Sequence, residues 1–376
     1  MKIKSRIAVA AGLAATAALT AVPAASGAPS SHSTTGTVFV QTDELSHNTI
    51  VTYTRSGSGA LHQAGSYRTG GKGGALDGAQ VDHLASQSSL VRSGDHLFAV
   101  NAGSNTITSF AIRGHRLVRQ QEINSGGEFP VSIAVSHGLL YVLNARGGGS
   151  IQGYLDLGGH LIKVPSWHRE LGFDPNATPE FTSTPAQIAF SPSNHDLVIT
   201  TKGDGSSIET FALGLLGSPA DTPVITELPG QVPFGFDFDR WGHLVASEAG
   251  TNSVATFRLR SDGRAAQRDQ LATGQQATCW VAVSKSGRVA YVSNAGSATI
   301  TSYRISRSGN LSPLQTVHTN PGTVDAAVSS DGRNLYVQTG AQGKVDGFRI
   351  DQDGLLTSIG SVTVPGAVGG EGIVAR

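Results

Sequence analysis

The chain has 376 residues, of which 48 are glycine and 14% are charged, and its 27 basic side chains balance 27 acidic ones. This balance, with no block of lysine or arginine, excludes the basic footprint of a nucleic-acid-binding protein. Cys279 is the single cysteine, which excludes an internal disulfide. Common Gly, Ser, Thr and Val with few helix-forming runs favour an all-β protein rich in turns.

The N-terminus carries a basic MKIKSR segment, the apolar run IAVAAGLAATAALTAV and the small residues PAASGAPS. This order predicts a secretory signal peptide over residues 1–28, cleaved somewhere in 25–30, since the run is short for a membrane span. We therefore expect a secreted protein with no membrane span after signal removal. A short linker at 29–37 would precede a single domain over 38–376.

From Val38 onward one pattern recurs seven times: a hydrophobic strand-type run, a small-residue turn, and a second β-rich run ending on an aromatic residue. The clearest copies are NAGSNTITSF at 101–110 and NAGSATITSY at 294–303. The first runs of the seven copies close at Thr42, Asn101, Asn144, Lys202, Glu248, Asn294 and Thr339. Short apolar segments such as PAQIAFSPSN precede every copy after the first. Four short strands about every 45 residues predict an all-β, seven-bladed β-propeller.

The two ends of the pattern predict how the ring closes. The chain enters the pattern at a second strand, VFVQT, and leaves it on an unpaired inner-strand segment, GGEGIVAR. Pairing the C-terminal segment beside residues 38–42 completes the first blade and leaves no open edge. A stacked sandwich of seven hairpin pairs is the alternative fold.

The NAGS turns, the SSDGRNLYV stretch at 329–337 and the SRSGNLSPLQ stretch at 306–315 resemble the seven-bladed lactonase family. That family includes propeller-type 6-phosphogluconolactonases of bacteria and carboxymuconate-cyclising enzymes of fungi. The resemblance covers nearly all of residues 38–376. It implies an enzyme that opens or forms a small cyclic ester.

In a propeller, inner strands begin where second strands end, so two rings of positions meet at one mouth of the channel. One ring consists of the seven residues, from Thr42 to Thr339, at which the first runs of the copies close. The inner strands contribute Ser88, Ser132, Gln187, Gly235, Trp280, Asp325 and Glu371. Two residues deeper, the wall is mostly small or apolar, with Leu90, Ala134, Ala189, Asp237, Ala282, Ala327 and Ile373. Because polar groups withdrawn from water need partners or a ligand, we expect the site at this polar mouth.

Opening a lactone requires a base to activate water and a donor to hold the developing oxyanion. We assign the base to Glu248 or Asp325 and carbonyl polarisation to Lys202. The substrate-binding candidates are Gln187, Trp280, Asn144, Asn294, Glu371, Ser132 and Phe234. Two alternatives remain: a Lys202–Glu248 salt bridge between blades, or Ca²⁺ or Mg²⁺ held by the carboxylates. No metal-loop spacing is present, so we expect no metal and no cofactor.

Two long connections, 66–83 and 165–183, should overhang the same mouth and add His83, His168, Arg169 and Asp174 to it. Cys279 is expected to be a small buried hydrophobe rather than a nucleophile. The expected partner is a small-molecule ligand or substrate, bound by a monomer. The competing hypotheses are a non-catalytic propeller that binds a small ligand or a protein, and a structural component of the cell surface.

Overall fold

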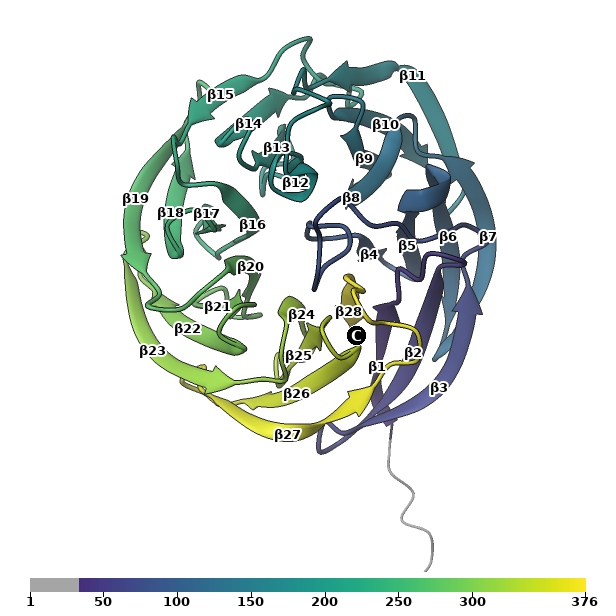
Figure 1. Ribbon diagram of the computed structural model, residues 1–376, viewed down its shortest axis with the longest axis vertical. Helices are drawn as coiled ribbons and strands as arrows, with labels where there is room; N and C mark the ends of the chain where they lie inside the picture. Colours follow the sequence, from purple (N-terminus) through teal and green to yellow (C-terminus); the bar gives the residue numbers. More distant parts are fainter. Residues whose placement is uncertain (1–33) are drawn as a thin grey trace, which may run out of the picture. The chain divides into compact units, whose positions relative to one another are not determined.

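The computed structural model describes residues 34–376, which form seven four-stranded antiparallel sheets arranged as the blades of a ring (Figure 1). The predicted seven-bladed propeller is therefore confirmed, and the stacked sandwich is excluded. The predicted signal peptide lies outside the described residues. Within residues 34–376, no helix has the length and apolar character needed to span a membrane.

The first blade combines strands from both ends of the described chain, and the next three follow in chain order. Blade 1 contains β28 (Ile373–Ala375), β1 (Thr34–Gln41), β2 (Thr49–Ser56) and β3 (Leu61–Arg68). Blade 2 contains β4 (Leu90–Ser93), β5 (His96–Asn101), β6 (Thr106–Arg113) and β7 (Arg116–Asn124). Blade 3 contains β8 (Glu128–Ser136), β9 (Leu139–Arg146), β10 (Ser150–Asp156) and β11 (Leu161–Glu170). Blade 4 contains β12 (Pro185–Phe190), β13 (Asp196–Thr201), β14 (Ser207–Ala212) and β15 (Val224–Glu227).

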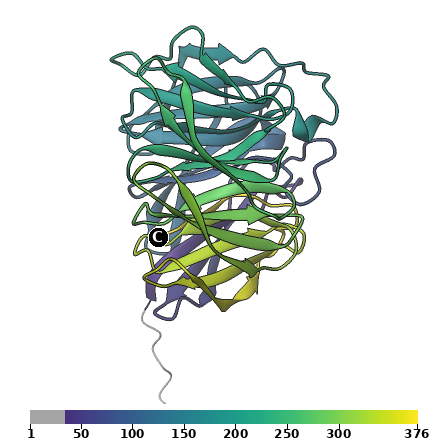
Figure 2. The ribbon, with the colours of Figure 1, turned by 90° about the vertical axis from the view of Figure 1, so that its left-hand side faces the viewer.

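The last three blades repeat the same order from the channel outward, and Figure 2 views them from the side. Blade 5 contains β16 (Pro233–Phe238), β17 (His243–Glu248), β18 (Ser253–Leu259) and β19 (Ala265–Ala272). Blade 6 contains β20 (Thr278–Val283), β21 (Val289–Asn294), β22 (Thr299–Ile305) and β23 (Leu311–His318). Blade 7 contains β24 (Thr323–Val328), β25 (Asn334–Thr339), β26 (Lys344–Ile350) and β27 (Leu356–Thr363). Two short 3₁₀ helices, η1 (Ala102–Ser104) and η2 (Glu180–Thr182), lie in connections.

The doubled phrase of the sequence is the hairpin between the second and third strands of blades 2 and 6. In blade 2 the side-chain amide of Asn101, the last residue of β5, donates to Thr106 at 3.0 Å and to Thr108 at 2.9 Å. Asn105 between the strands has φ 54°, a left-handed conformation that asparagine tolerates well. The phrase recurs because an Asn donor and Thr acceptors at these positions form the same hydrogen bonds in both hairpins.

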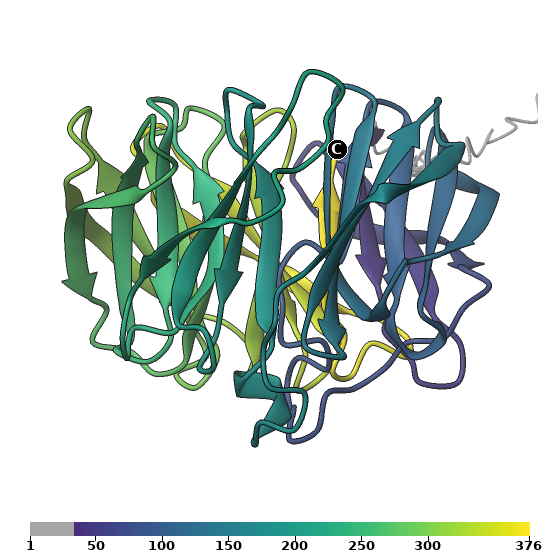
Figure 3. The same ribbon diagram turned by 90° about the horizontal axis from the view of Figure 1, so that it is seen from above.

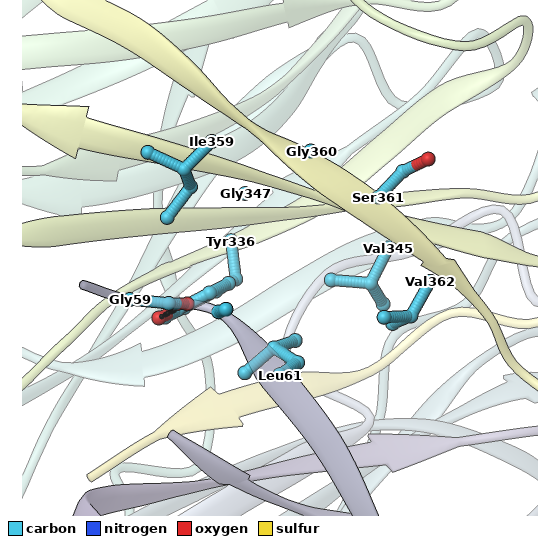
Figure 4. A pocket seen from close by; sticks show the side chains of 10 residues that line it. Gly59, Leu61, Tyr336, Val345, Gly347, Ile359, Gly360, Ser361 and Val362 are labelled. Carbon is cyan, nitrogen blue, oxygen red and sulfur yellow. Dashed lines mark hydrogen bonds between the residues drawn. The ribbon is translucent and has the colours of Figure 1, made fainter. Parts of the chain in front are cut away.

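The ring closes as predicted. β28 pairs antiparallel with β1, with Phe39 opposite Val374. The seam between blades 1 and 7 is packed with apolar side chains around a cavity of about 140 Å³ (Figure 4). There the hydroxyl of Tyr336 donates to the carbonyl of Gly59 at 2.7 Å. β1 begins at Thr34 and pairs with β2 from there, so the predicted linker at 29–37 overlaps the first strand.

The connection 69–89 and η2 lie on the face of the ring where inner strands begin (Figure 3). The last part of this connection, residues 82–89, enters the centre of the ring just before β4 (Figure 1). Leu84 in this segment is fully buried in the largest apolar cluster of the propeller. The first long connection thus lies on the face where the sequence predicts the mouth, and the residues that follow it, up to β4, fill the mouth.

Candidate functional site

Residues 82–89, which we call the plug, form a buried turn inside the channel. The carboxylate of Asp82 accepts hydrogen bonds from the backbone N–H groups of Leu84 and Ser86, both at 2.9 Å. Asp82 is 4% exposed and Ser86 is fully buried. The plug therefore belongs to the packed interior, and it covers the mouth at which the sequence predicts the site.

Hydrogen bonds to the inner strands of blades 3 and 6 hold the plug in place. The amide of Gln87 donates to the carbonyl of Val281 at 2.7 Å and accepts the N–H of the same residue at 3.1 Å. The Ser132 hydroxyl donates to the Gln87 carbonyl at 2.7 Å, and the Trp280 indole N–H donates to the Ser86 carbonyl at 2.7 Å. Ser132 and Trp280, predicted to bind substrate, thus bind the plug backbone.

Lys202 also lies beneath the plug. Its Nζ donates to the carbonyl of Ala85 at 2.5 Å and stands 5.4 Å from the centre of the Phe234 ring. Burial lowers the pKa of Lys202 to about 7, an effect that the charge of Asp82 partly offsets. Burial likewise raises the pKa of the Asp82 carboxyl to about 7. The Phe234 ring packs edge-on against Trp280 at 5.1 Å, so Phe234 supports the plug contacts from the side.

Asp325 and Glu371 lie close together under the plug, and the Asp325 carboxyl accepts the backbone N–H of Ile373 at 3.3 Å. The Glu371 carboxyl also accepts from the Ser86 hydroxyl at 3.3 Å, and its backbone N–H donates to the Asp43 carboxyl at 2.8 Å. Burial raises the pKa of Asp325 to about 7 and that of Asp43 to about 8. It raises the pKa of Glu371 well above its ordinary value, with the charge of Asp325 adding to the effect. These carboxyls therefore hold their protons to higher pH than exposed carboxyls do.

Glu248 does not join this cluster. Its carboxylate accepts from the Ser253 hydroxyl and from the Gln270 amide, both at 2.6 Å, and both partners belong to its own blade. Glu248 stands directly opposite Ser253 in the β17–β18 ladder, so its side chain lies along the hairpin. Among residues 34–376, no salt bridge joins it to Lys202. The inter-blade pair is not formed, and a shared Lys202–Glu248 substrate site has no support in the geometry.

Asn144 and Asn294, like Glu248, form hydrogen bonds to the neighbouring strand of their own blade. The Asn144 amide donates to Ser150 at 3.4 Å, and the Asn294 amide donates to Thr299 at 3.1 Å, each across its own hairpin. The sequence pattern placed these residues correctly at the ends of second strands. It could not show that strand-closing side chains serve their hairpins rather than the channel.

The open end of the channel is the end where inner strands finish, and it holds a cavity of about 530 Å³. Its wall includes the deeper positions that the sequence predicts as a packed channel wall: Ala134, Ala189, Asp237, Ala282 and Ala327. Gln87 and Ser88 of the plug form part of the lining. The small side chains leave the channel hollow at this end, which corrects the prediction of a packed wall.

Asp237 is the carboxylate in the wall of this cavity. Its two oxygens accept the backbone N–H groups of Phe238 at 2.7 Å and Val283 at 2.9 Å. Burial raises the pKa of Asp237, and the positive charge of Lys285, an exposed residue that also lines the cavity, opposes that rise. Gln187, a predicted ligand-binding residue, lines the same cavity, although its amide is bonded to both backbone groups of Phe236. Cavity and carboxylate together can hold a small molecule beside a base.

The second long connection contributes less to the channel than predicted. His168 and Arg169 lie on the outermost strand β11, where His168 contacts Glu170 at 2.8 Å and Arg169 contacts Asp221 at 3.1 Å. They do not reach the mouth, because the strand carries them to the rim of the ring. His83 is a half-buried residue of the plug itself, and burial lowers its pKa.

Cys279 is half-buried between two buried residues, Thr278 and Trp280, and burial raises the pKa of its thiol to about 12. A thiol of this kind is protonated near neutral pH and is a poor nucleophile. Within residues 34–376, no three His, Cys, Asp or Glu side chains form a group that could hold a metal ion. Sequence reasoning missed Asp43 and Asp82. The signal for Asp43 was its place next to a buried strand, and the signal for Asp82 was its place next to an uncharged, partly apolar stretch of loop.

The seven four-stranded blades, with one mouth of the channel plugged and a cavity at the other, define the class of the protein as a seven-bladed β-propeller. Residues 16–150 and 230–369 match the family model described as Lactonase, 7-bladed beta-propeller. The chain belongs to this family, and membership supports a lactone-related function. A search of curated proteins found no match.

Solved structures share the fold at low sequence identity. A candidate 6-phosphogluconolactonase from Bacteroides fragilis NCTC 9343 superposes with a TM-score of 0.71 at 20% identity, over 92% of this chain and 99% of the other. The periplasmic gluconolactonase of Pseudomonas aeruginosa gives 0.72 at 18%, over 90% and 98%. Virginiamycin B lyase from Staphylococcus aureus gives 0.56 at 14%, over 78% and 90%. At these identities the similarity shows the fold alone, because one fold hosts many reactions.

Proposed function

We propose that the protein hydrolyses a small lactone in the cavity at the open end of the channel, with Asp237 as the general base. The observation that carries this proposal is a half-buried carboxylate in the wall of a cavity of about 530 Å³. Such a volume suits a ligand of small-molecule size. Family membership and the printed names of the gluconolactonase neighbours support the choice of a lactone.

The chemistry requires one proton acceptor and one positive charge. Asp237 would take a proton from a water molecule as the water oxygen attacks the lactone carbonyl carbon. Lys285, and Arg92 across the cavity, would stabilise the negative charge on the carbonyl oxygen. The ring C–O bond then breaks, and the proton passes from Asp237 to the departing alkoxide. The raised pKa of Asp237 favours this transfer, because a base with a pKa nearer neutrality both takes and returns a proton readily.

The experiment measures hydrolysis of a panel of sugar and aromatic lactones by wild type, Asp237→Asn and Glu248→Gln. We expect Asp237→Asn to lower kcat/KM by about 10²–10⁴ and Glu248→Gln to leave it within about threefold. Unfolding midpoints of all three proteins check that the variants are folded. Background rates for wild type would refute catalysis on the panel. Loss in Glu248→Gln but not in Asp237→Asn would move the site to the mouth that the sequence predicts.

A second candidate is a non-catalytic propeller that binds a small ligand in the same cavity. Both oxygens of Asp237 and the amide of Gln187 are already hydrogen-bonded within the protein, which favours binding over turnover. In that case lactones raise the unfolding temperature of wild type without being consumed. We also propose that the protein is exported as a monomer, which fractionation of the producing cells and light scattering of the purified protein test.

A further inference from the structure

The third strand of blade 4 departs from the hairpin chemistry of the doubled phrase. In blade 2, Asn101 donates to Thr108 at 2.9 Å, and blade 6 repeats this bond. At the equivalent positions blade 4 has Thr201 and Glu209, because Thr201 pairs with Ser207 as Asn101 pairs with Thr106. The Asn–Thr pair is thus replaced by a hydroxyl and a carboxylate.

These two residues do not form a pair. The Thr201 hydroxyl bonds to the Ser207 hydroxyl at 2.9 Å, and Lys202, the next residue, reaches inward to the plug carbonyl of Ala85. Glu209 is 3% exposed, its Oε1 has one long contact of 3.5 Å with the Ser207 hydroxyl, and its Oε2 has no hydrogen-bond partner. A buried polar oxygen left unpaired costs about 1–3 kcal/mol and calls for an explanation.

Glu209 lines a cavity of about 610 Å³ between the end of β11 and blade 4. In the β14–β15 ladder Ser207 stands opposite Glu227 and Glu209 opposite Ile225, so Glu209 and Glu227 are diagonal neighbours on one face. Asp174 and Asp204 line the same cavity, and the Asp204 carboxylate accepts the backbone N–H of Asp174 at 2.8 Å. None of the lining residues, all within the described range 171–230, is basic.

An aromatic ring completes the cavity wall. Phe173 is half-buried and packs over Gly205, where a Cβ atom would come within 2.8 Å of the ring. Glycine at position 205 therefore permits the ring to lie beside the acidic residues. An aromatic face next to carboxylates attracts an ammonium group. The volume is that of an organic ligand.

We propose that this cavity binds a linear aliphatic polyamine, with one ammonium group on Glu209 Oε2 and the others at Asp174, Asp204 and Glu227. A primary ammonium on an alkyl chain is slender enough to reach a buried oxygen and supplies the missing donor. The carboxylates nearer the surface match further charges along the chain. The site is separate from the channel cavity, so it does not depend on the proposed lactone hydrolysis.

Isothermal titration calorimetry with spermidine tests the proposal on wild type, Glu209→Gln and Glu209→Thr. Threonine is the residue that the doubled phrase carries at this position, so the strand should accept it. Asp262→Asn is the matched control, because it removes one exposed carboxylate from a turn of blade 5. We expect wild type to bind one spermidine, both Glu209 variants to lose at least tenfold in affinity, and the control to stay within twofold.

The uncharged 1,8-octanediol should give no binding heat, whereas equal binding of the diol would refute recognition of charge. No heat with spermidine, or equal affinity in the Glu209 variants and wild type, would overturn the proposal. Ca²⁺ binding that depends on Glu209 and displaces spermidine would also overturn it in favour of a metal site. The unfolding midpoint of each variant is compared with that of wild type. A midpoint equal to or above that of wild type shows that the variant is folded, so that its weaker binding does not come from unfolding.

Discussion

Replacing Gln87 with leucine tests whether the plug is part of the packed interior. The substitution removes both hydrogen bonds to Val281, which is 1% exposed, and leaves its N–H and carbonyl unpaired inside the channel. Two buried unpaired groups at about 1–3 kcal/mol each, less the gain from a buried apolar side chain, give an expected loss of about 2–5 kcal/mol in the free energy of unfolding.

The matched control is Gln121→Leu. Gln121 on β7 makes the same pair of bonds to the backbone of Leu161, at 3.1 and 2.6 Å, but lies half-exposed on the rim of the ring. Leu161 itself is 1% exposed, so water can replace the lost amide only by entering the space that Gln121 leaves at the rim; we expect a loss of about 1 kcal/mol, smaller than that of Gln87→Leu. Urea unfolding measures both values, provided the slope with denaturant is unchanged. Equal losses in the two variants would refute the view that the plug is buried structure.

Two further predictions concern the buried carboxyls and the ring closure. The folded pKa values of Asp43, Asp82 and Asp325 are raised to about 8, 7 and 7, so the folded state binds more protons than the unfolded state between about pH 4 and 7. The free energy of unfolding should therefore fall as pH rises through this window. Urea unfolding at pH 5 and pH 7 measures this decline, and Asp325→Asn should make it smaller. An unchanged decline in the variant would contradict the burial of the Asp325 carboxyl. Ile373→Ala on β28, a residue 4% exposed, should cost about 2–4 kcal/mol, because it empties part of the closing seam. The control is Ile162→Ala, because Ile162 is 44% exposed and its loss should change the free energy of unfolding by less than about 1 kcal/mol. Similar losses in Ile373→Ala and Ile162→Ala would argue against closure by β28.

The fold was predictable because its signals are local and repeated. Asn101 and the threonines after it form one hairpin, and the same letters at Asn294 form another. Ring closure was predictable because residues 373–375 needed a strand to pair with and residues 38–40 offered one. Residues at fixed positions of paired strands contact one another, so a repeated sequence pattern predicts these contacts directly.

The candidate site was less predictable because side-chain directions depend on contacts between distant segments. Lys202 points inward because its ammonium group donates to the carbonyl of Ala85, which is far away in the sequence but lies inside the channel. Glu248 is the last paired residue of its strand, opposite Ser253, to which it bonds, whereas Lys202 lies one residue beyond Thr201, the last paired residue of β13. The sequence pattern aligned the two residues and so missed this shift of one position. The plug itself has neither a helical nor a strand period, so the pattern assigned its first residues to a connection and Ser88 to an inner strand, and it did not predict a buried turn.

Closure by β28 has a consequence for how the protein folds. The pairing of Val38 with Ala375 joins residues at opposite ends of the described chain, so it is the contact with the greatest loop-closure cost in the ring. Until it forms, β1 presents an unpaired edge and the channel has a gap in its wall, a state prone to pairing with another chain. We expect this last step to limit the folding rate, so that folding is slow compared with the formation of individual blades.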